Sequence, residues 1–159
     1  MKISILCVGK IKEKYFQDAL AEYRKRLGKY CNLELIEVAD EKTPDGASDL
    51  LEDKIKEKEA LRILKYFDDN AFHITLEIEG KKMTSVQFAK QIEQIGIHGK
   101  SHIQFFIGGS LGLHKIVCDK ADLKLSFSDM TFPHQLMRVI LLEQIYRSYR
   151  ITNGEPYHK

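Results

Sequence analysis

The chain has 159 residues, of which 43% are hydrophobic and 30% are charged, with a formal net charge of +2. This length and composition indicate one soluble globular domain with a sizeable core. No run of about 18 apolar residues occurs, so no membrane span is expected. The three cysteines are widely spaced and form no CxxC or zinc pattern, which is typical of reduced thiols in a cytoplasmic protein.

Charge is distributed unevenly along the chain. Residues 1–30 hold eight Lys or Arg and three Asp or Glu, a charge of +5, whereas residues 31–69 hold six and twelve, a charge of −6. This asymmetry is compatible with a basic face for an anionic partner. Ordinary solvated helices would give the same counts, so charge alone leaves both interpretations open.

The first 66 residues alternate between strand and helix patterns. Short apolar runs predict two buried strands, and apolar residues three or four apart predict two helices. A polar loop over 43–46 precedes the second helix, which Ser48 or Asp49 is expected to cap. We expect that helix to bury Leu51, Ile55, Leu61 and Leu64. In chain order the elements are strand 3–8, helix 15–27, strand 33–38 and helix 49–66.

The rest of the chain continues the alternation. Thr84 or Ser85 is expected to cap a helix that Gly96 ends. Pro133 precedes a last, amphipathic helix. In chain order the elements are strand 72–78, helix 84–95, strand 103–107, helix 113–120, strand 123–127 and helix 134–151.

Alternating strands and helices predict an α/β fold with a mostly parallel sheet and helices on both faces. Ligands bind to such sheets beyond the carboxyl ends of the strands. Three of these ends carry glycine or polar residues, namely 76–80, 107–112 and 127–133. The sequence therefore predicts a ligand site where these three segments meet.

Two of the three segments have distinctive chemistry. Glycines in 108–112 let the backbone approach a ligand, but the stretch is neither a Walker A loop nor a dinucleotide fingerprint. A simple tight turn is the alternative. Hydroxyl, carboxylate and apolar groups in 127–133 suit an adenosyl group. The alternative role of that segment is to begin the last helix through Ser128, Asp129 or Thr131.

Histidines give no metal pattern. His98 and His102 are four apart, but Gly99 lies between them in a predicted loop, so no metal site is expected. His73 lies in a predicted strand and is interpreted as structural. His134 is interpreted as a first-turn residue of the last helix.

The C-terminal residues Tyr157, His158 and Lys159 combine an aromatic ring, an imidazole and an amine. Such a group suits a flipped base on a phosphate backbone. Arg147 of the last helix is a further candidate phosphate ligand. The alternative for Arg147 is an i,i+4 ion pair with Glu143.

The last predicted helix is apolar over more than half of its circumference. A helix of this kind needs more than one partner surface. We therefore expect a homodimer that buries it, with the active site near the two-fold axis. The residues concerned are Met137, Val139, Leu141, Leu142, Ile145, Tyr146 and Tyr149.

Several motifs together identify a family. The chain contains FIGGSLG, then LSxSxxTxPHQLxRxxLxEQxYR, then GxPYHK, with IxxVGK in the first strand and LxxxG after the third. Over its whole length it resembles the bacterial ribosomal RNA large subunit methyltransferase H family, which is of the SPOUT class. A small departure is Lys159 in place of a family arginine, which keeps the charge but weakens a bidentate phosphate contact.

The resemblance implies a single SPOUT-type domain over 1–159, with a C-terminal deep trefoil knot and S-adenosylmethionine pocket within about 72–159. It implies a homodimer that methylates N3 of a pseudouridine in 23S rRNA of the assembled ribosome, without a metal. The cofactor would contact Leu76, Gly108 and the loop Phe127, Ser128, Asp129, Met130, Thr131 and Phe132. The catalytic group would be His158, as candidate base, with Arg147, Tyr157 and Lys159.

Two other functions stay open at this point. One is a SPOUT-type RNA methyltransferase with a different target atom. The other is a ribosome-binding module that keeps the fold without catalysis. Binding of S-adenosylmethionine separates the second alternative from both enzymes.

Overall fold

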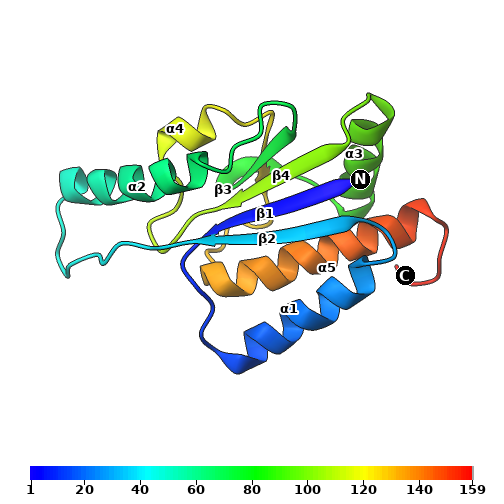
Figure 1. The fold of residues 1–159 in the computed structure, drawn as a ribbon, viewed down its shortest axis with the longest axis horizontal. Coiled ribbons are helices and arrows are strands. Elements are labelled where there is room, and N and C mark those ends of the chain that lie inside the picture. Colours follow the sequence, from blue (N-terminus) through cyan, green and yellow to red (C-terminus); the bar gives the residue numbers. More distant parts are fainter. Residues whose placement is uncertain (159) are drawn as a thin grey trace.

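The computed structural model describes residues 1–158 and contains one sheet of five strands (Figure 1). The strand order is β2-β1-β4-β3-β5, and every neighbouring pair is parallel. The predicted single-domain α/β fold is therefore confirmed. In chain order the elements are β1 (Lys2–Val8), α1 (Lys14–Leu27), β2 (Asn32–Val38), α2 (Asp49–Leu64), β3 (Phe72–Lys82), α3 (Ser85–Ile97), β4 (His102–Ile107), α4 (Lys115–Cys118), β5 (Leu123–Ser126) and α5 (His134–Thr152).

Helices cover both faces of the sheet. Because successive residues of a strand point to opposite faces, Ile5 of β1 enters one core and Leu6 enters the other. Helices α1, α3 and α5 contribute to the first core, through residues such as Leu27, Phe88 and Leu141. Helix α2 and the short α4 cover the second face, on the opposite side of the sheet from α1 and α5 (Figure 1).

Helix α5 packs against both α1 and α3 within the chain. Leu141, Leu142 and Ile145 are fully buried in the first core, and Met137 and Tyr149 pack against it. The broad apolar surface of α5 is thus largely used inside one protomer. It does not by itself require a second chain, so the homodimer needs a different argument.

Helix α2 confirms one prediction and corrects another. The Ser48 hydroxyl accepts a hydrogen bond from the Leu51 N–H at 3.2 Å, as expected for the cap. The predicted inward face is partly right, because Ile55 is buried and Leu64 packs against the second core, but Leu51 is 38% and Leu61 is 54% exposed. Ile63, which was not predicted, is fully buried in that core. Apolar residues on two sides of the helix made the sequence pattern ambiguous.

The ends of two other helices also differ from the prediction. Thr84 and Gln87 form a capping box at the start of α3. The helix passes through Gly96, and the left-handed turn that follows it is at Gly99, with φ of +85°. Helix α4 is only one turn long, and it begins at Lys115 because the His114 side chain caps it, accepting the N–H of Ile116.

Strand β3 is longer than predicted. The sequence predicts an end at Ile78, but the strand continues after a register shift between Leu76 and Lys81. Both of those residues pair with Leu125 of β5, so the segment between them leaves the ladder. A Cβ at Gly80 would lie 2.7 Å from the Leu125 carbonyl carbon. Only glycine allows the two backbones to come this close.

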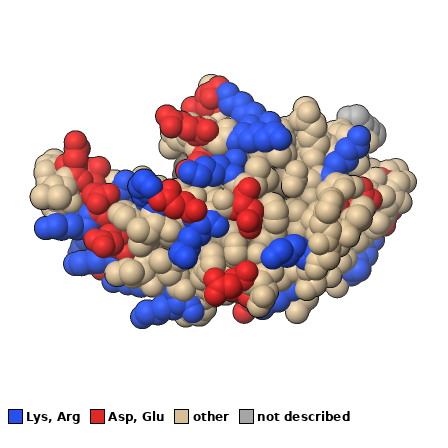
Figure 2. All heavy atoms as spheres, turned by 90° about the horizontal axis from the view of Figure 1, so that it is seen from above, with Lys and Arg blue, Asp and Glu red and all other residues tan. Residues whose placement is uncertain are grey.

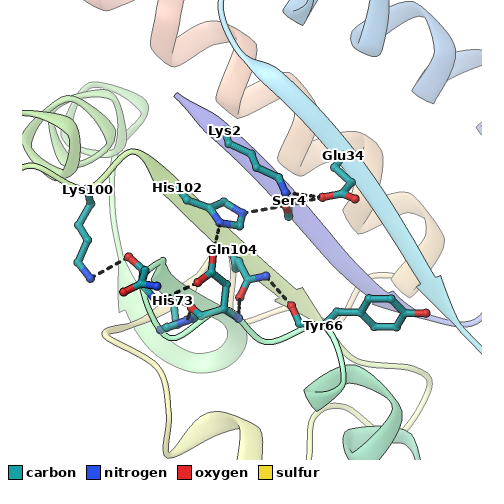
Figure 3. Close-up of polar contacts among 10 residues, drawn as sticks. Lys2, Ser4, Glu34, Tyr66, His73, Lys100, His102 and Gln104 are labelled. Carbon is teal, nitrogen blue, oxygen red and sulfur yellow. Dashed lines mark hydrogen bonds and ion pairs between the residues drawn. The ribbon is translucent and has the colours of Figure 1, made fainter.

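A chain of hydrogen bonds lies at the amino ends of the strands (Figure 3). The His102 ring lies 2.9 Å from Ser4 Oγ through Nε2 and 2.8 Å from Asp68 Oδ2 through Nδ1. The hydrogen bond from His102 lowers the pKa of Asp68. Ser4 is fully buried and offers no access to a substrate. This serine, histidine and aspartate therefore tie β1, β4 and the loop before β3 together rather than form a catalytic triad.

Within residues 1–158, no helix is long and apolar enough to cross a membrane. Strand order does not test the predicted trefoil knot, because many threadings share one order. The knot and its boundary near residue 72 stay predictions.

Candidate cofactor pocket and C-terminal tail

A hollow of about 670 Å³ lies at the carboxyl ends of β3, β4 and β5. Its walls come from the three segments that the sequence marked, together with the first turn of α5. Parallel strands bring their carboxyl ends to one edge of the sheet, which explains why segments distant in sequence meet here. The lining residues are Leu76, Glu77, Ile78, Ile107, Gly108, Gly109, Ser110, Leu111, Gly112, Leu125, Phe127, Ser128, Met130, Thr131, Phe132, Pro133, His134 and Met137.

All but one of the residues predicted to bind a cofactor line this hollow. The exception is Asp129, whose carboxylate is exposed and pairs with Lys82 of β3. The loop from 127 to 133 is held by its own hydrogen bonds, since the Ser128 hydroxyl accepts from Met130 N–H at 3.0 Å. It does not cap the last helix, because the N-cap residue of α5 is Pro133.

The glycine-rich loop is both a tight turn and a wall of the hollow. Gly109 and Gly112 are linked by a 3.0 Å backbone hydrogen bond, and Gly112 has a φ of +84°. A Cβ on Gly108 would lie 2.3 Å from the Gly112 carbonyl carbon. The loop therefore requires glycine at 108 to close on itself. Both interpretations of this stretch describe the same backbone.

The chemistry of the walls is mostly apolar. Leucine, isoleucine, phenylalanine and methionine side chains surround a few hydroxyls and the carboxylate of Glu77. No lysine or arginine is among the lining residues that the structure describes. Such a hollow suits a ligand with a flat apolar ring and a positive charge, because no cation repels it.

His134 is a lining residue that the sequence did not identify. Burial, and secondarily the Arg138 guanidinium, lower the pKa of the His134 imidazole. The ring is therefore uncharged at neutral pH and presents a neutral polar group to the hollow. Nothing in the sequence separates this role from that of an ordinary first-turn residue.

Arg138 holds the start of α5 against the sheet. Its guanidinium is 1% exposed, pairs with Glu37 at 2.9 Å, and donates to the carbonyl oxygens of Val8 and Gly9 at 2.8 Å. These bonds fix the first turns of α5 to the ends of β1 and β2. Breaking a buried pair of this kind is costly, since one charge would lose its partner.

The tail folds back onto the other end of α5. Arg147 pairs with Glu143 at 2.6 Å, and its guanidinium carbon lies 4.7 Å from the centroid of the Tyr157 ring. The Tyr157 hydroxyl donates to Glu143 at 3.2 Å, and His158 Nδ1 lies 3.3 Å from Arg147 Nη1. The structure thus brings together Arg147, Tyr157 and His158. Lys159 lies outside the described residues.

Hollow and tail are far apart in one chain. Arg147 is ten residues beyond Met137 on α5, about 15 Å along the helix axis at the usual rise. No residue of the tail up to His158 lines the hollow. The ion pair of Arg147 with Glu143 was the alternative expected from spacing, and it coexists with the contact to His158.

A parallel α/β sheet with a ligand hollow built by its carboxyl-end loops defines the class. The chain belongs to the SPOUT methyltransferase family, since a model described as predicted SPOUT methyltransferase matches residues 1–158. The protein is therefore a methyltransferase. Within the described residues, no group of three or more His, Cys, Asp or Glu is arranged to hold a metal ion.

Curated relatives make the family more specific. The chain is 64% identical to the ribosomal RNA large subunit methyltransferase H of Bifidobacterium adolescentis, over the full length of both. It is 57% identical to the protein of the same name from Clostridium kluyveri, again over both full lengths. The family that the motifs indicated is thus confirmed.

Solved structures of lower similarity share the fold. A probable methylase family protein from Haemophilus influenzae aligns with a TM-score of 0.56 at 12% identity, covering 99% of this chain and 70% of that one. The tRNA (m1G37) methyltransferase from Aquifex aeolicus aligns with a TM-score of 0.53 at 13% identity, covering 92% and 70%. At such identities the likeness concerns the fold alone.

Proposed function

We propose that this protein methylates N3 of a pseudouridine in 23S rRNA, within the assembled ribosome and in the cytoplasm. S-adenosylmethionine would be the methyl donor. The names of the relatives, which specify the RNA of the large ribosomal subunit, support an rRNA substrate. The target atom and the ribosomal context rest on the family resemblance.

The hollow fits S-adenosylmethionine in size and chemistry. Its volume of about 670 Å³ lies in the range usual for cofactor sites. Apolar residues from the 127–132 loop and Leu76 would hold the adenosyl group, and the absence of lining cations among the described residues favours a sulfonium. When bound, the cofactor supplies an activated methyl group.

The separation of hollow and tail is the observation that supports a dimeric form of this enzyme. A tail that acts on a bound nucleotide must reach the methyl group, yet it lies about 15 Å along α5 from the hollow of its own chain. In a symmetric dimer, each tail can complete the hollow of the other chain. We therefore propose a homodimer with two composite sites. A particle of about 18.4 kDa in light scattering at micromolar concentration would contradict it.

The contacts of the tail support the following proposed roles for its side chains. Arginine is only a donor, so Arg147 donates to His158 Nδ1, and the imidazole then carries its proton on Nε2. His158 thus presents an N–H to the substrate. N3 of pseudouridine would lose its proton to solvent first, and the imide anion would then attack the methyl carbon, with S-adenosylhomocysteine as the leaving group. Arg147 and the His158 N–H would stabilise the resulting negative charge.

Positioning is the other contribution of the protein. The 127–132 loop and Met137 would exclude water and hold N3 about 3 Å from the methyl carbon. Tyr157 would stack on the target base, as aromatic side chains do on splayed nucleotides. Its ring already packs edge to face on Tyr146, with centroids 5.0 Å apart, and so is held in place.

One experiment tests the proposal. The protein is incubated with labelled S-adenosylmethionine and, separately, naked 23S rRNA, large subunits and whole ribosomes, and the methylated nucleotide is mapped. We expect N3-methylpseudouridine only with whole ribosomes. A label on another atom would indicate a different SPOUT RNA methyltransferase. Failure to bind the cofactor in calorimetry would indicate a ribosome-binding module.

A further inference from the structure

The C-terminal end of α1 lies against the tail. Tyr30, just after α1, donates a 2.6 Å hydrogen bond to Glu155 of the tail, and Lys29 lies 3.6 Å from the same carboxylate. The Arg26 guanidinium carbon lies 5.8 Å from the centroid of the Tyr146 ring, which also packs on Tyr157. The end of α1 and the tail therefore form one continuous surface.

Positive charge is concentrated on this surface. Within six residues the chain carries Arg24, Lys25, Arg26 and Lys29, all exposed. Arg26 pairs with Glu22 at 2.8 Å. In contrast, neither Arg24 nor Lys25 has an ion pair within residues 1–158. Exposed cations that form no ion pair are available to an anion, because no existing ion pair has to be broken first.

A polar hollow opens at the same place. It has a volume of about 610 Å³ and lies between the end of α1 and the beginnings of β1 and β2, at the opposite edge of the sheet from the cofactor hollow. Arg24 and Lys29 line it, Tyr30 and Asn32 add hydrogen-bonding groups, and none of its lining residues within 1–158 carries a carboxylate. We call this feature the α1 hollow, and Lys25 follows Arg24 on the same helix.

We propose that the α1 hollow binds the phosphate backbone of the rRNA that flanks the target nucleotide. The inference rests on the proposed function, because it is the tail that would hold the target base. RNA whose base lies at Tyr157 must continue over the adjoining surface, and Tyr30 connects the two through Glu155. Lysine and arginine bind phosphates without reading sequence, which suits a positioning contact.

Other charged surfaces fit an anionic strand less well. Figure 2 shows acidic and basic side chains interspersed along α2, where Asp49, Glu52, Asp53 and Glu57 alternate with lysines. A mixed surface of this kind has no net attraction for a polyanion. The α1 hollow, by contrast, is lined by the cations Arg24 and Lys29 and, among residues 1–158, by no acidic side chain.

Charge reversal tests the proposal. The double variant Arg24→Glu, Lys25→Glu is compared with Lys54→Glu, Lys58→Glu on α2, which changes the net charge equally at exposed sites. We expect the α1 variant to bind whole ribosomes on the order of 10-fold or more weakly at 0.1 M salt. The slope of log affinity against log salt should fall by roughly one to two. The α2 variant should bind like the wild type.

Two further measurements keep the outcome interpretable. Arg24→Gln, Lys25→Gln avoids new acidic groups at a helix C-terminus and should give an intermediate loss. Cofactor affinity and dimer mass should be unchanged in all three variants. Equal affinity and salt slope for the α1 and α2 variants would overturn the inference while leaving methylation by the wild type intact. If the wild type modifies another nucleotide but the α1 variant still binds weakly, the proposed target fails and this inference stands.

Discussion

The two ends of α5 have different surroundings, although the arginines at both ends pair with glutamates. At its N-terminal end the guanidinium of Arg138 is buried and bound to Glu37, and an uncharged His134 faces an apolar hollow. At its C-terminal end Arg147 and Arg150 are surrounded by tyrosines and an exposed tail. An adenosyl group with a positive sulfonium and a polyanionic RNA need these different environments.

Arg138 and Arg147 show that one kind of ion pair can have two different roles. Both pair with a glutamate, but the side chain of Arg138 is 1% exposed and that of Arg147 is 25% exposed. Arg138 gives its donors to backbone carbonyls and holds the fold. Arg147 gives one donor to His158 and remains reachable from solvent. Burial, more than the identity of the partner, separates a structural arginine from a candidate catalytic one.

The largest expected effect comes from removing the tail. Deletion of 154–159 should abolish methyl transfer, because Tyr157 and His158 would be lost from the composite site. Cofactor binding and dimerisation should persist, since none of the described tail residues lines the hollow of its own chain. Transfer of a labelled methyl group to ribosomes measures activity, calorimetry measures cofactor binding, and light scattering measures dimerisation. Wild-type turnover in the deletion variant would move catalysis to Arg147 and the 127–132 loop.

Gly108→Val tests the hollow, which lies at the N-terminal end of α5. A side chain at this position meets the Gly112 backbone at 2.3 Å, so the glycine-rich loop must rearrange. We expect cofactor affinity to fall on the order of 10²-fold, because the added side chain fits only if the backbone that lines the hollow moves. Gly96→Ala on α3, which meets only the end of Met1, is the matched control. Circular dichroism should stay native for both, and unchanged affinity in folded Gly108→Val would remove the loop from the site.

Mixed dimers of these two variants test whether the tail of one chain acts on the hollow of the other. A protomer lacking its tail keeps its hollow, and a Gly108→Val protomer keeps its tail, so one composite site per mixed dimer is intact. We expect co-expressed mixed dimers to recover methyl transfer that neither homodimer shows. No recovery in purified mixed dimers would mean that tail and hollow of the same chain act together.

His158 should show a smaller effect that reports its role. If its Nε2–H stabilises charge, His158→Ala lowers kcat on the order of 10-fold, less than for a donor in a water-excluded site because His158 is exposed, and His158→Gln recovers part of it by supplying another N–H. A general base would cost about 10²-fold or more, and an amide would not replace it. Single-turnover rates on ribosomes distinguish the two. A loss above 10²-fold without rescue by glutamine would restore the general-base assignment.

The smallest effect concerns pH at the other end of α5. The pKa of His134 is lowered in the folded protein, so the folded state favours the neutral ring. This contribution to stability is complete above the unfolded pKa near 6.5 and is lost as pH falls toward the folded value. His134→Asn should therefore unfold with a shallower pH dependence below 6.5. The exposed His98→Asn is the control, and equal slopes in thermal melts would contradict the assignment.

Local patterns of the sequence determined most of the elements and the place of the site. Apolar runs such as 3–8 and 103–107 are strands, Ser48 and Thr84 cap helices, and the marked carboxyl ends form the hollow. These features depend on short-range sterics and on the common direction of parallel strands. They can therefore be read without knowing which residues touch.

Only the tertiary structure decided which of several compatible contacts formed. The pairing of Leu125 with both Leu76 and Lys81 lengthened β3, and the sheet selected Ile55 over Leu51 on α2. Burial, and secondarily the Arg138 guanidinium, lowered the pKa of His134 and made it a neutral lining residue. The length of α5 keeps the described part of the tail away from the hollow of its own chain. Each of these outcomes depends on partners distant in sequence, whose competition for the same surface no local pattern records.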